Sequence, residues 1–521
     1  MFRILAALGI ALAIALAIAL VSLLAIGCRV PGTDRADADA GRGALESLQV
    51  AGAAGWYPAF DPDVHHYAVR CADATRLQVS ARAVDDGARL TMLHSGRTEI
   101  GAIAETVTAD SGHDLAIEIR GSRATSTYYL HCIPPDFPDV TIETRTEAVT
   151  GGLLLMTPGV RRTDISFLAI MDNNGVPRRV MRPNVSARNF RRHPDGRFSF
   201  SERGADGLER TVILDAALNR IDTVTLVAPL LPEHTGGHDF LITDNGNYLQ
   251  MSYYPAERDL SGFTCRNEDD TTRPCSTAEP ADDSVIQEVA PDAGEVWRWN
   301  SWDHVKIADC TIHRFPNDYA HLNSLHELDG DIVAGLRGCA QVLRIERATG
   351  AVVWQIGGSE PMRADRPAPS TGATRYLPVE NDPLGEFCGQ HHVTATPAGS
   401  LLMFDNGNHC LGPRKDLPPV TRIVEYDISS GAGARFVREY RLPEEDGVAV
   451  SGGGVTALPS GNWLVTWGSN GPRIAVSEVD TAGNEVFRMS MSRDGRAYGT
   501  GRVYRENEAA LDLQPNFPAA P

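Results

Sequence analysis

A short pattern built around a histidine occurs three times in this chain and constrains its fold more than any other feature. The copies contain His238, His321 and His391, which lie about 70 to 80 residues apart, and each histidine stands eight or nine residues before the glycine of a tight turn. An apolar strand pattern follows each turn. Repeats of this length are typical of radial folds, in which equivalent positions of different repeats face a common axis. The pattern therefore predicts that three histidines far apart in sequence meet in space.

The region around these histidines, residues 137–510, repeats one plan throughout. A turn joins two apolar strand patterns and a third strand ends near a tryptophan, and we count six such units without a long stretch of helical periodicity between them. Many short strands at even spacing with a recurring aromatic residue predict an all-β fold, most simply a six-bladed β-propeller. A β-helix or two β-sandwiches are the alternatives. The turns that define the units are Asn174-Gly175, Asp195-Gly196, Asn245-Gly246, Asp329-Gly330, Ala398-Gly399 and Ser460-Gly461.

A smaller all-β pattern precedes the propeller, at residues 45–136. Its apolar residues alternate with polar neighbours, as at Tyr67, Val69 and Cys71, and turn residues separate the strand patterns. We therefore predict a small β-sandwich domain here. The opening of this domain, which includes Tyr57-Pro58-Ala59-Phe60, resembles the cadherin-like β-sandwich of bacterial surface proteins.

The first 28 residues are predicted to be an export or anchor segment. The basic start is followed by an apolar run from Ile4 to Ile26, which is long enough to span a bilayer as an uncleaved helix. The run ends at Cys28 in a sequence that resembles a bacterial lipobox, with Ala25 where leucine is more usual. We expect a protein exported to the cell envelope and tethered to the membrane by a lipid or a signal anchor. Residues 29–44 would form a flexible tether and residues 511–521 a C-terminal tail.

The cysteines support an oxidising compartment. The chain has nine, and setting Cys28 aside for a lipid leaves eight, which fall into neighbouring pairs. The closely spaced CxxC motifs of structural zinc sites are absent from the sequence. We therefore expect four disulfides and no metal. The expected pairs are Cys71 with Cys132, Cys265 with Cys275, Cys310 with Cys339, and Cys388 with Cys410.

The charges indicate what kind of partner to expect. A formal net charge of -19 argues against nucleic acid, which requires a basic face. The charge expected near the histidines is positive instead. Arg337 ends the strand pattern that follows His321, and it would join the histidines if that hairpin turns back toward the axis. Three imidazoles and one guanidinium suit a small anionic substrate such as a sulfate, phosphate or carboxylate. One neutral imidazole can act as a nucleophile while another moves protons.

Several short motifs stand in an order that is more specific than any one of them. They are Asp318-Tyr319-Ala320-His321-Leu322-Asn323-Ser324, Gly335-Leu336-Arg337, Thr349-Gly350, Trp354-Gln355-Ile356-Gly357-Gly358, Gln390-His391-His392 and Phe404-Asp405-Asn406-Gly407. In this order they resemble the arylsulfotransferase family, and the similarity runs from about residue 150 to about residue 510. The resemblance implies a six-bladed propeller that moves a sulfuryl group from an aryl sulfate to a phenol, with no nucleotide sulfate donor and no cofactor. No Gly-x-x-x-x-Gly-Lys phosphate loop occurs in the sequence.

The resemblance also implies a role for each site residue. His391, directly after Gln390, would be the nucleophile that becomes a transient sulfohistidine. His321 and His238 would bind sulfate oxygens and move the phenol proton, and Arg337 would stabilise charge on the sulfuryl oxygens. His392 is next to the expected nucleophile, and strand alternation predicts that only one of the two side chains points inward.

Two other functions are compatible with parts of the pattern. Three histidines can bind zinc and leave a position open for water, as in a metal-dependent hydrolase, although Arg337 in the same layer argues against a cation site. Sandwich and propeller could also form a non-catalytic binding or scaffold protein of the envelope, because a fold alone does not decide function.

Overall fold

The computed structural model describes most of the residues that follow the N-terminal segment. Residues 1–28 and nearly all of the expected tether therefore lie outside the described part of the chain. Among the residues that are described, no helix is both long and apolar enough to cross a membrane. The described residues are 43–160, 163, 165–267, 271–292, 294–310, 318–358, 374–396, 398–408, 410, 414, 417–443, 447–468 and 473–519.

The chain forms two compact units, and among the described residues the first contains 43–132 together with 516–519. Two antiparallel sheets share one core here, with Leu77 and Val79 contributed by one sheet and Ile117 and Ile119 by the other, so this unit is a β-sandwich. The end of the chain binds to it, because the backbone N–H of Asn516 donates to the Asp114 carboxylate. One sheet contains β1 (Leu45–Ala51), β4 (Thr75–Ala83) and β7 (Ala102–Ala109); the other contains β2 (Trp56–Tyr57), β3 (His66–Arg70), β9 (Thr125–Ile133), β8 (Asp114–Arg120), β5 (Arg89–Met92) and β6 (Thr98–Ile100).

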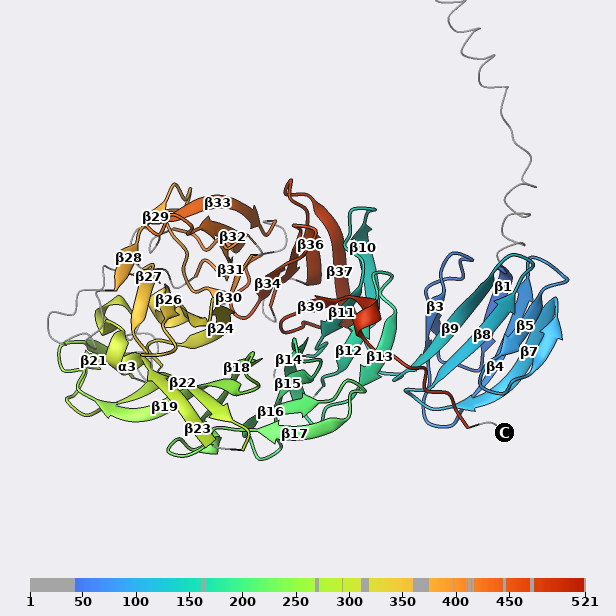
Figure 1. Ribbon diagram of the computed structural model, residues 1–521, viewed down its shortest axis with the longest axis horizontal. Helices are drawn as coiled ribbons and strands as arrows, with labels where there is room; N and C mark the ends of the chain where they lie inside the picture. Colours follow the sequence, from blue (N-terminus) through green and yellow to red (C-terminus); the bar gives the residue numbers. More distant parts are fainter. Residues whose placement is uncertain are drawn as a thin grey trace, which may run out of the picture. The chain divides into compact units, whose positions relative to one another are not determined.

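The second unit, residues 133–515, is a six-bladed β-propeller, and the predicted all-β class is confirmed. Figure 1 shows its six sheets arranged around a common centre, which the innermost strand of each sheet borders. The first blade consists of β39 (Tyr504–Glu506), β11 (Leu153–Met156), β12 (Leu168–Met171) and β13 (Pro177–Met181). The second consists of β14 (Ser186–Arg192), β15 (Phe198–Arg203), β16 (Glu209–Leu214) and β17 (Arg220–Val224). The third consists of β18 (Thr235–Ile242), β19 (Tyr248–Arg258), β22 (Glu279–Ala290) and β23 (Gly294–Asn300).

The other three blades continue the same order from the inside outward. Apolar side chains fill the space between neighbouring blades; Ile286 and Trp299 of the third blade, for example, share a cluster with Leu325 and Leu343 of the fourth. The fourth blade consists of β24 (Leu322–Leu328), β25 (Asp331–Leu336), β26 (Gln341–Ile345), β27 (Val352–Ile356) and β28 (Arg375–Leu377). The fifth consists of β30 (His391–Ala395), β31 (Leu401–Asp405), β32 (Arg422–Asp427), β33 (Ala434–Arg441) and β29 (Val379–Glu380). The sixth consists of β34 (Gly454–Ala457), β35 (Trp463–Thr466), β36 (Ile474–Val479), β37 (Glu485–Arg493) and β10 (Asp139–Arg145).

Both ends of the propeller sequence take part in closing the ring. The entering strand β10 pairs with the outer strand β37 of the last blade, and the leaving strand β39 pairs with β11 as the innermost strand of the first. A buried ion pair joins the same two blades, because Arg505 Nη2 lies 2.8 Å from Glu478 Oε2 and Arg505 Nη1 donates to Asn173. Residues near the C-terminus are thereby fixed beside the centre of the propeller.

The innermost strands are irregular at the positions where the chemistry was expected. The pairing of β14, β18, β24 and β30 with the next strand shifts register in each case. Asn189, His321 and His392 adopt positive φ angles of 57°, 50° and 44°, in the left-handed region that non-glycine residues seldom occupy. Bulges and such residues re-aim side chains and are frequent beside active sites.

All four expected disulfides are present and confirm the pairing read from the sequence. Their number indicates an oxidising, exported environment. Cys310–Cys339 attaches the segment before His321 to the end of the hairpin that carries Arg337, and Cys388–Cys410 restrains the segment that leads into β30. Two of the four therefore hold chain segments that flank the predicted site.

Candidate active site

The propeller brings the four sequence-predicted residues into one cluster. His238 lies within β18, His321 directly precedes β24, and His391 is the first residue of β30. Arg337 opens the 3₁₀ helix η3 (Arg337–Cys339) after β25, and its backbone N–H donates to the His321 carbonyl at 3.0 Å. The ring centroids of His238 and His321 are 5.3 Å apart, and the charges of Arg337 and His321 both act on His391.

The tautomer of His391 follows from its hydrogen bonds. Its Nδ1 lies 2.6 Å from Oδ1 of Asn406. The amide nitrogen of Asn406 donates to the carbonyls of Ala449, at 2.7 Å, and Gly452, at 3.1 Å, so Oδ1 is the amide atom that faces the imidazole. An amide oxygen can only accept, so Nδ1 carries the proton and Nε2 keeps a lone pair. The Gly452 N–H, 3.3 Å from Nε2, points at this lone pair.

His391 is also held in its neutral form. Its side chain belongs to a residue only 4% exposed, and burial lowers the pKa of His391 well below its usual value, with the Arg337 charge acting in the same direction. The hydrogen bond that Nδ1 of His391 donates to Asn406 opposes this shift in pKa but does not outweigh it. A neutral imidazole with a lone pair on Nε2 is a nucleophile at neutral pH.

His238 has the same tautomer for a different reason. The Tyr253 hydroxyl has one proton, which it donates to the Leu322 carbonyl at 2.6 Å. It must therefore accept from Nδ1 of His238, which is 3.0 Å away, and the lone pair of His238 is left on Nε2. Burial lowers the pKa of His238 well below the usual value and raises the pKa of Tyr253 well above it, so both groups are neutral.

His321 differs from the other two because its partner is a carboxylate. Its Nδ1 is hydrogen-bonded to Asp318 Oδ2, and both side chains are 23% exposed. The ring of Tyr253 stacks on the His321 imidazole at a centroid distance of 5.3 Å and an interplanar angle of 28°. This histidine therefore reaches solvent while its ring orientation is restrained from two sides.

A second guanidinium, which the sequence analysis missed, lies beside the cluster. Arg502 is 5% exposed, forms an ion pair with Asp239, and donates to the Asn323 carbonyl. Its positive charge lowers the pKa of both His238 and His391. Arg502 precedes β39, so the closure of the ring is what carries it to the site.

Three hydrogen-bond partners of the histidines were also missed as functional residues. Asp318 and Asn406 stand within the motifs noted above, so a signal for them existed although their contacts were not foreseen. Tyr253 follows His238 on the next strand and has no local signature. Strand bulges displace such partners from simple alternation, and spacing alone cannot pair them with their histidines.

The sequence predicted that only one of the His391 and His392 side chains points inward. Both are 4% exposed, because the positive φ of His392 interrupts the alternation of the strand. Nδ1 of His392 accepts the Val455 N–H at 3.1 Å, so this imidazole is bonded to the backbone of the sixth blade. His392 therefore holds two blades together and has no link to Asn406.

Within the described ranges, no group of three or more His, Cys, Asp and Glu side chains is arranged to hold a metal ion.

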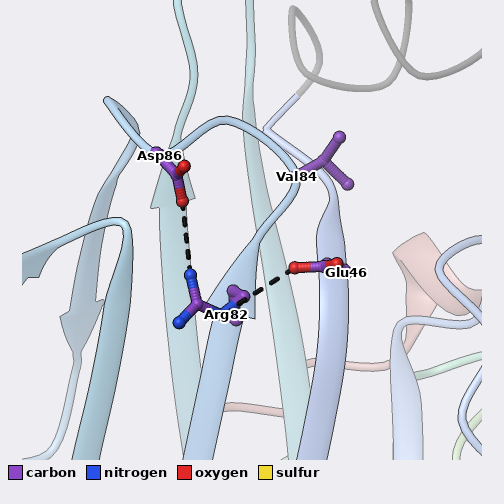
Figure 2. A pocket seen from close by; sticks show the side chains of 4 residues that line it. All are labelled: Glu46, Arg82, Val84 and Asp86. Carbon is purple, nitrogen blue, oxygen red and sulfur yellow. Dashed lines mark hydrogen bonds and ion pairs between the residues drawn. The ribbon is translucent and has the colours of Figure 1, made fainter. Parts of the chain in front are cut away.

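A pocket in the first unit is not an alternative catalytic centre. It is lined by Glu46, Arg82, Val84 and Asp86, and Figure 2 shows the Arg82 guanidinium between the two carboxylates. Arg82 lies 3.3 Å from Asp86 and 3.8 Å from Glu46, and all three charged side chains are more than half exposed. Solvated pairs of this kind are frequent on protein surfaces and do not indicate chemistry.

Residues 210–492 match the family described as arylsulfotransferase (ASST). No curated protein matches the chain. Similar solved structures include a protein of unknown function from Bacteroides caccae, with 12% identity, coverage of 67% of this chain and 99% of that one, and a TM-score of 0.38. A quinonprotein alcohol dehydrogenase-like protein from Bacteroides thetaiotaomicron has 9% identity, coverage of 86% of this chain and 97% of that one, and a TM-score of 0.32. Apo AztD from Citrobacter koseri has 12% identity, coverage of 68% of this chain and 98% of that one, and a TM-score of 0.32. Likeness at this level does not indicate what the chain binds or transforms.

Proposed function

The chain belongs to the arylsulfotransferase family, and we propose that it moves a sulfuryl group from an aryl sulfate to a phenolic acceptor through a sulfohistidine at His391. The observation that carries this proposal is the hydrogen bond between His391 Nδ1 and Asn406 Oδ1, which leaves a lone pair on Nε2 of a buried, neutral imidazole. A sulfate monoester is anionic and repels an anionic nucleophile. A neutral nitrogen beside two guanidinium groups suits it better.

In the first half-reaction, Nε2 of His391 attacks sulfur and the bond between sulfur and the aryl oxygen breaks. The departing oxygen takes a proton from Nε2 of His321. The sulfuryl group is then bonded to His391, whose Nδ1–H still donates to Asn406. The Gly452 N–H, which points at Nε2 before the reaction, is available to a sulfuryl oxygen afterwards.

In the second half-reaction, the phenol acceptor gives its proton to Nε2 of His321 and its oxygen attacks sulfur. The nitrogen–sulfur bond breaks, and the electron pair returns to Nε2 of His391. Both histidines are thereby restored to their starting forms. Before this step, the O–H of the incoming phenol donates to the lone pair on Nε2 of His238, which orients the phenol, and it turns to His321 only as its oxygen attacks.

Arg337 and Arg502 supply the electrostatic part of the proposed mechanism. Negative charge shifts among the sulfuryl oxygens, the leaving oxygen and the attacking oxygen during transfer, and fixed positive charge lowers the energy of that transition state. The same two charges favour the neutral form of His391. The two guanidinium groups therefore have two effects: they keep the nucleophile His391 neutral and they stabilise the negative charge of the sulfuryl group.

The proposal is tested with purified protein, an aryl sulfate that releases a coloured nitrophenol, and a phenol acceptor. We expect transfer that a chelator does not abolish, a burst of nitrophenol without acceptor, and sulfate bound to the peptide that contains His391. His391→Asn is expected to abolish all three, while His234→Asn, a histidine on the 3₁₀ helix η1 (Pro232–His234) before β18, is the matched control. Transfer activity retained by His391→Asn would remove this residue from the nucleophile role, and a folded wild-type protein with no transfer would leave the scaffold alternative.

We also propose that the chain is held at the cell envelope by a lipid on Cys28, with small-molecule aryl sulfates and phenols as substrates. The apolar run and the lipobox-like sequence before Cys28 support this proposal. Mass spectrometry of the N-terminal peptide from membranes tests it. An intact residue 1–28 segment, or unchanged membrane association of Cys28→Ala, would contradict the lipid.

A further inference from the structure

The three histidines of the site differ in the partner that each Nδ1 faces. His391 faces an amide oxygen and His238 a phenol oxygen, which are both neutral. His321 alone faces a carboxylate, that of Asp318. A negative partner stabilises the positively charged imidazolium, whereas a neutral acceptor does so far less.

The surroundings of Asp318 strengthen this effect. Its second oxygen, Oδ1, is buried and has no hydrogen-bond partner among the described residues. The carboxylate charge is therefore incompletely solvated and is directed at the His321 ring. The charged and titratable groups on neighbouring elements include Asp282 of β22, whose pKa is raised by burial and by the Asp318 charge, together with His238 of β18, Tyr253 of β19, Arg337 of η3 and His391 of β30.

We propose that Asp318 is a positioning residue that makes His321 the proton carrier in both halves of the transfer. This inference rests on the function proposed above. With Asp318 ionised, Nδ1–H of His321 donates to it throughout, and Nε2 gains and loses the mobile proton. The imidazolium protonates the aryl oxygen as its bond to sulfur breaks, and the neutral ring then accepts the proton of the acceptor phenol as its oxygen attacks sulfur.

The role of Asp318 has a consequence for the substrate class. A simple phenol has a pKa near that of tyrosine, about 10, and leaves poorly unless it is protonated. A nitrophenol is a better leaving group and needs little protonation. Asp318 therefore extends the donors from activated aryl sulfates to sulfates of ordinary, unactivated phenols.

The test compares Asp318→Asn with wild type on a series of para-substituted phenyl sulfates. General acid catalysis contributes about a hundredfold or more, so we expect kcat/KM to fall by about that factor for phenyl sulfate and by less than about threefold for nitrophenyl sulfate. The dependence of rate on leaving-group pKa should become steeper. Asp318→Glu, which keeps the carboxylate, should recover part of the loss for phenyl sulfate.

Each outcome of this comparison either supports or overturns the proposed role of Asp318. An equal loss for all donors, or no loss for any, would overturn the role of Asp318, since a merely structural contribution does not depend on the leaving group. If Asp318→Asn does not fold, Asp318→Ser removes the same charge and is judged by the same comparison. Failure of the wild-type protein to transfer any sulfuryl group would instead overturn the proposed function itself.

Discussion

Nδ1 of His391 donates to Oδ1 of Asn406 across 2.6 Å, and this contact decides which nitrogen of the imidazole can react. The amide of Asn406 is itself fixed by two backbone carbonyls of the segment that precedes β34. The orientation of the nucleophile therefore depends on the neighbouring blade.

Asn406→Ala should slow sulfohistidine formation more than it weakens donor binding. The substitution removes the acceptor of Nδ1 and frees the ring to rotate, and a lost buried hydrogen bond of this kind costs about 1–3 kcal/mol. We expect the burst rate to fall roughly tenfold to a hundredfold. Rapid-mixing measurement of nitrophenol release checks this, and an unchanged burst rate would show that Asn406 does not orient His391.

Arg337→Gln should lower the rate about a hundredfold, because removing one charge-stabilising group costs on the order of 3 kcal/mol in the transition state. The loss should appear in kcat with donors of every leaving group, unlike the loss in Asp318→Asn. Arg375→Gln, at an exposed arginine in β28, serves as the control. Equal effects of the two substitutions would argue against a specific role for Arg337.

His193 should make the wild-type protein less stable as the pH falls below 6.5. Burial lowers the pKa of His193 to about 2 in the folded state, and Arg191 and Arg197 act in the same direction. Below pH 6.5 the unfolded chain binds a proton that the folded chain does not, so this residue subtracts stability increasingly until the pH reaches the folded pKa.

The measurement that isolates His193 is urea unfolding of wild type and His193→Gln between pH 7 and pH 4. The difference in the free energy of unfolding should change by about 1.4 kcal/mol per pH unit in favour of the variant as the pH falls below 6.5. A difference that is constant across this range would contradict a buried neutral His193.

Cys388→Ser/Cys410→Ser should destabilise the fold and impair transfer together. The disulfide closes a loop with a sequence separation of 22 residues and restrains the segment just before His391. Loop closure of this size is worth about 3 kcal/mol. Denaturant unfolding measures the loss, and a variant with wild-type stability would show that other contacts already restrain this segment.

Much of the architecture was accessible from the residues alone. Strand alternation, turn dipeptides and recurring aromatics predicted the all-β class, and neighbouring cysteines predicted all four disulfides. These features are local, because side-chain alternation and turn conformations depend on residues close in sequence. His392 marks where local reasoning fails, since its positive φ breaks the alternation that was assumed for the strand.

The sequence by itself determined that three histidines recur at equivalent positions, with an arginine after the second, and so which groups can do chemistry. Only the tertiary structure decided what each nitrogen is able to do. The contacts of Tyr253 with Leu322 and of Arg502 with Asn323 join residues 69 and 179 positions apart. A tautomer and a pKa depend on the partner and the burial of a group, and ring closure sets both.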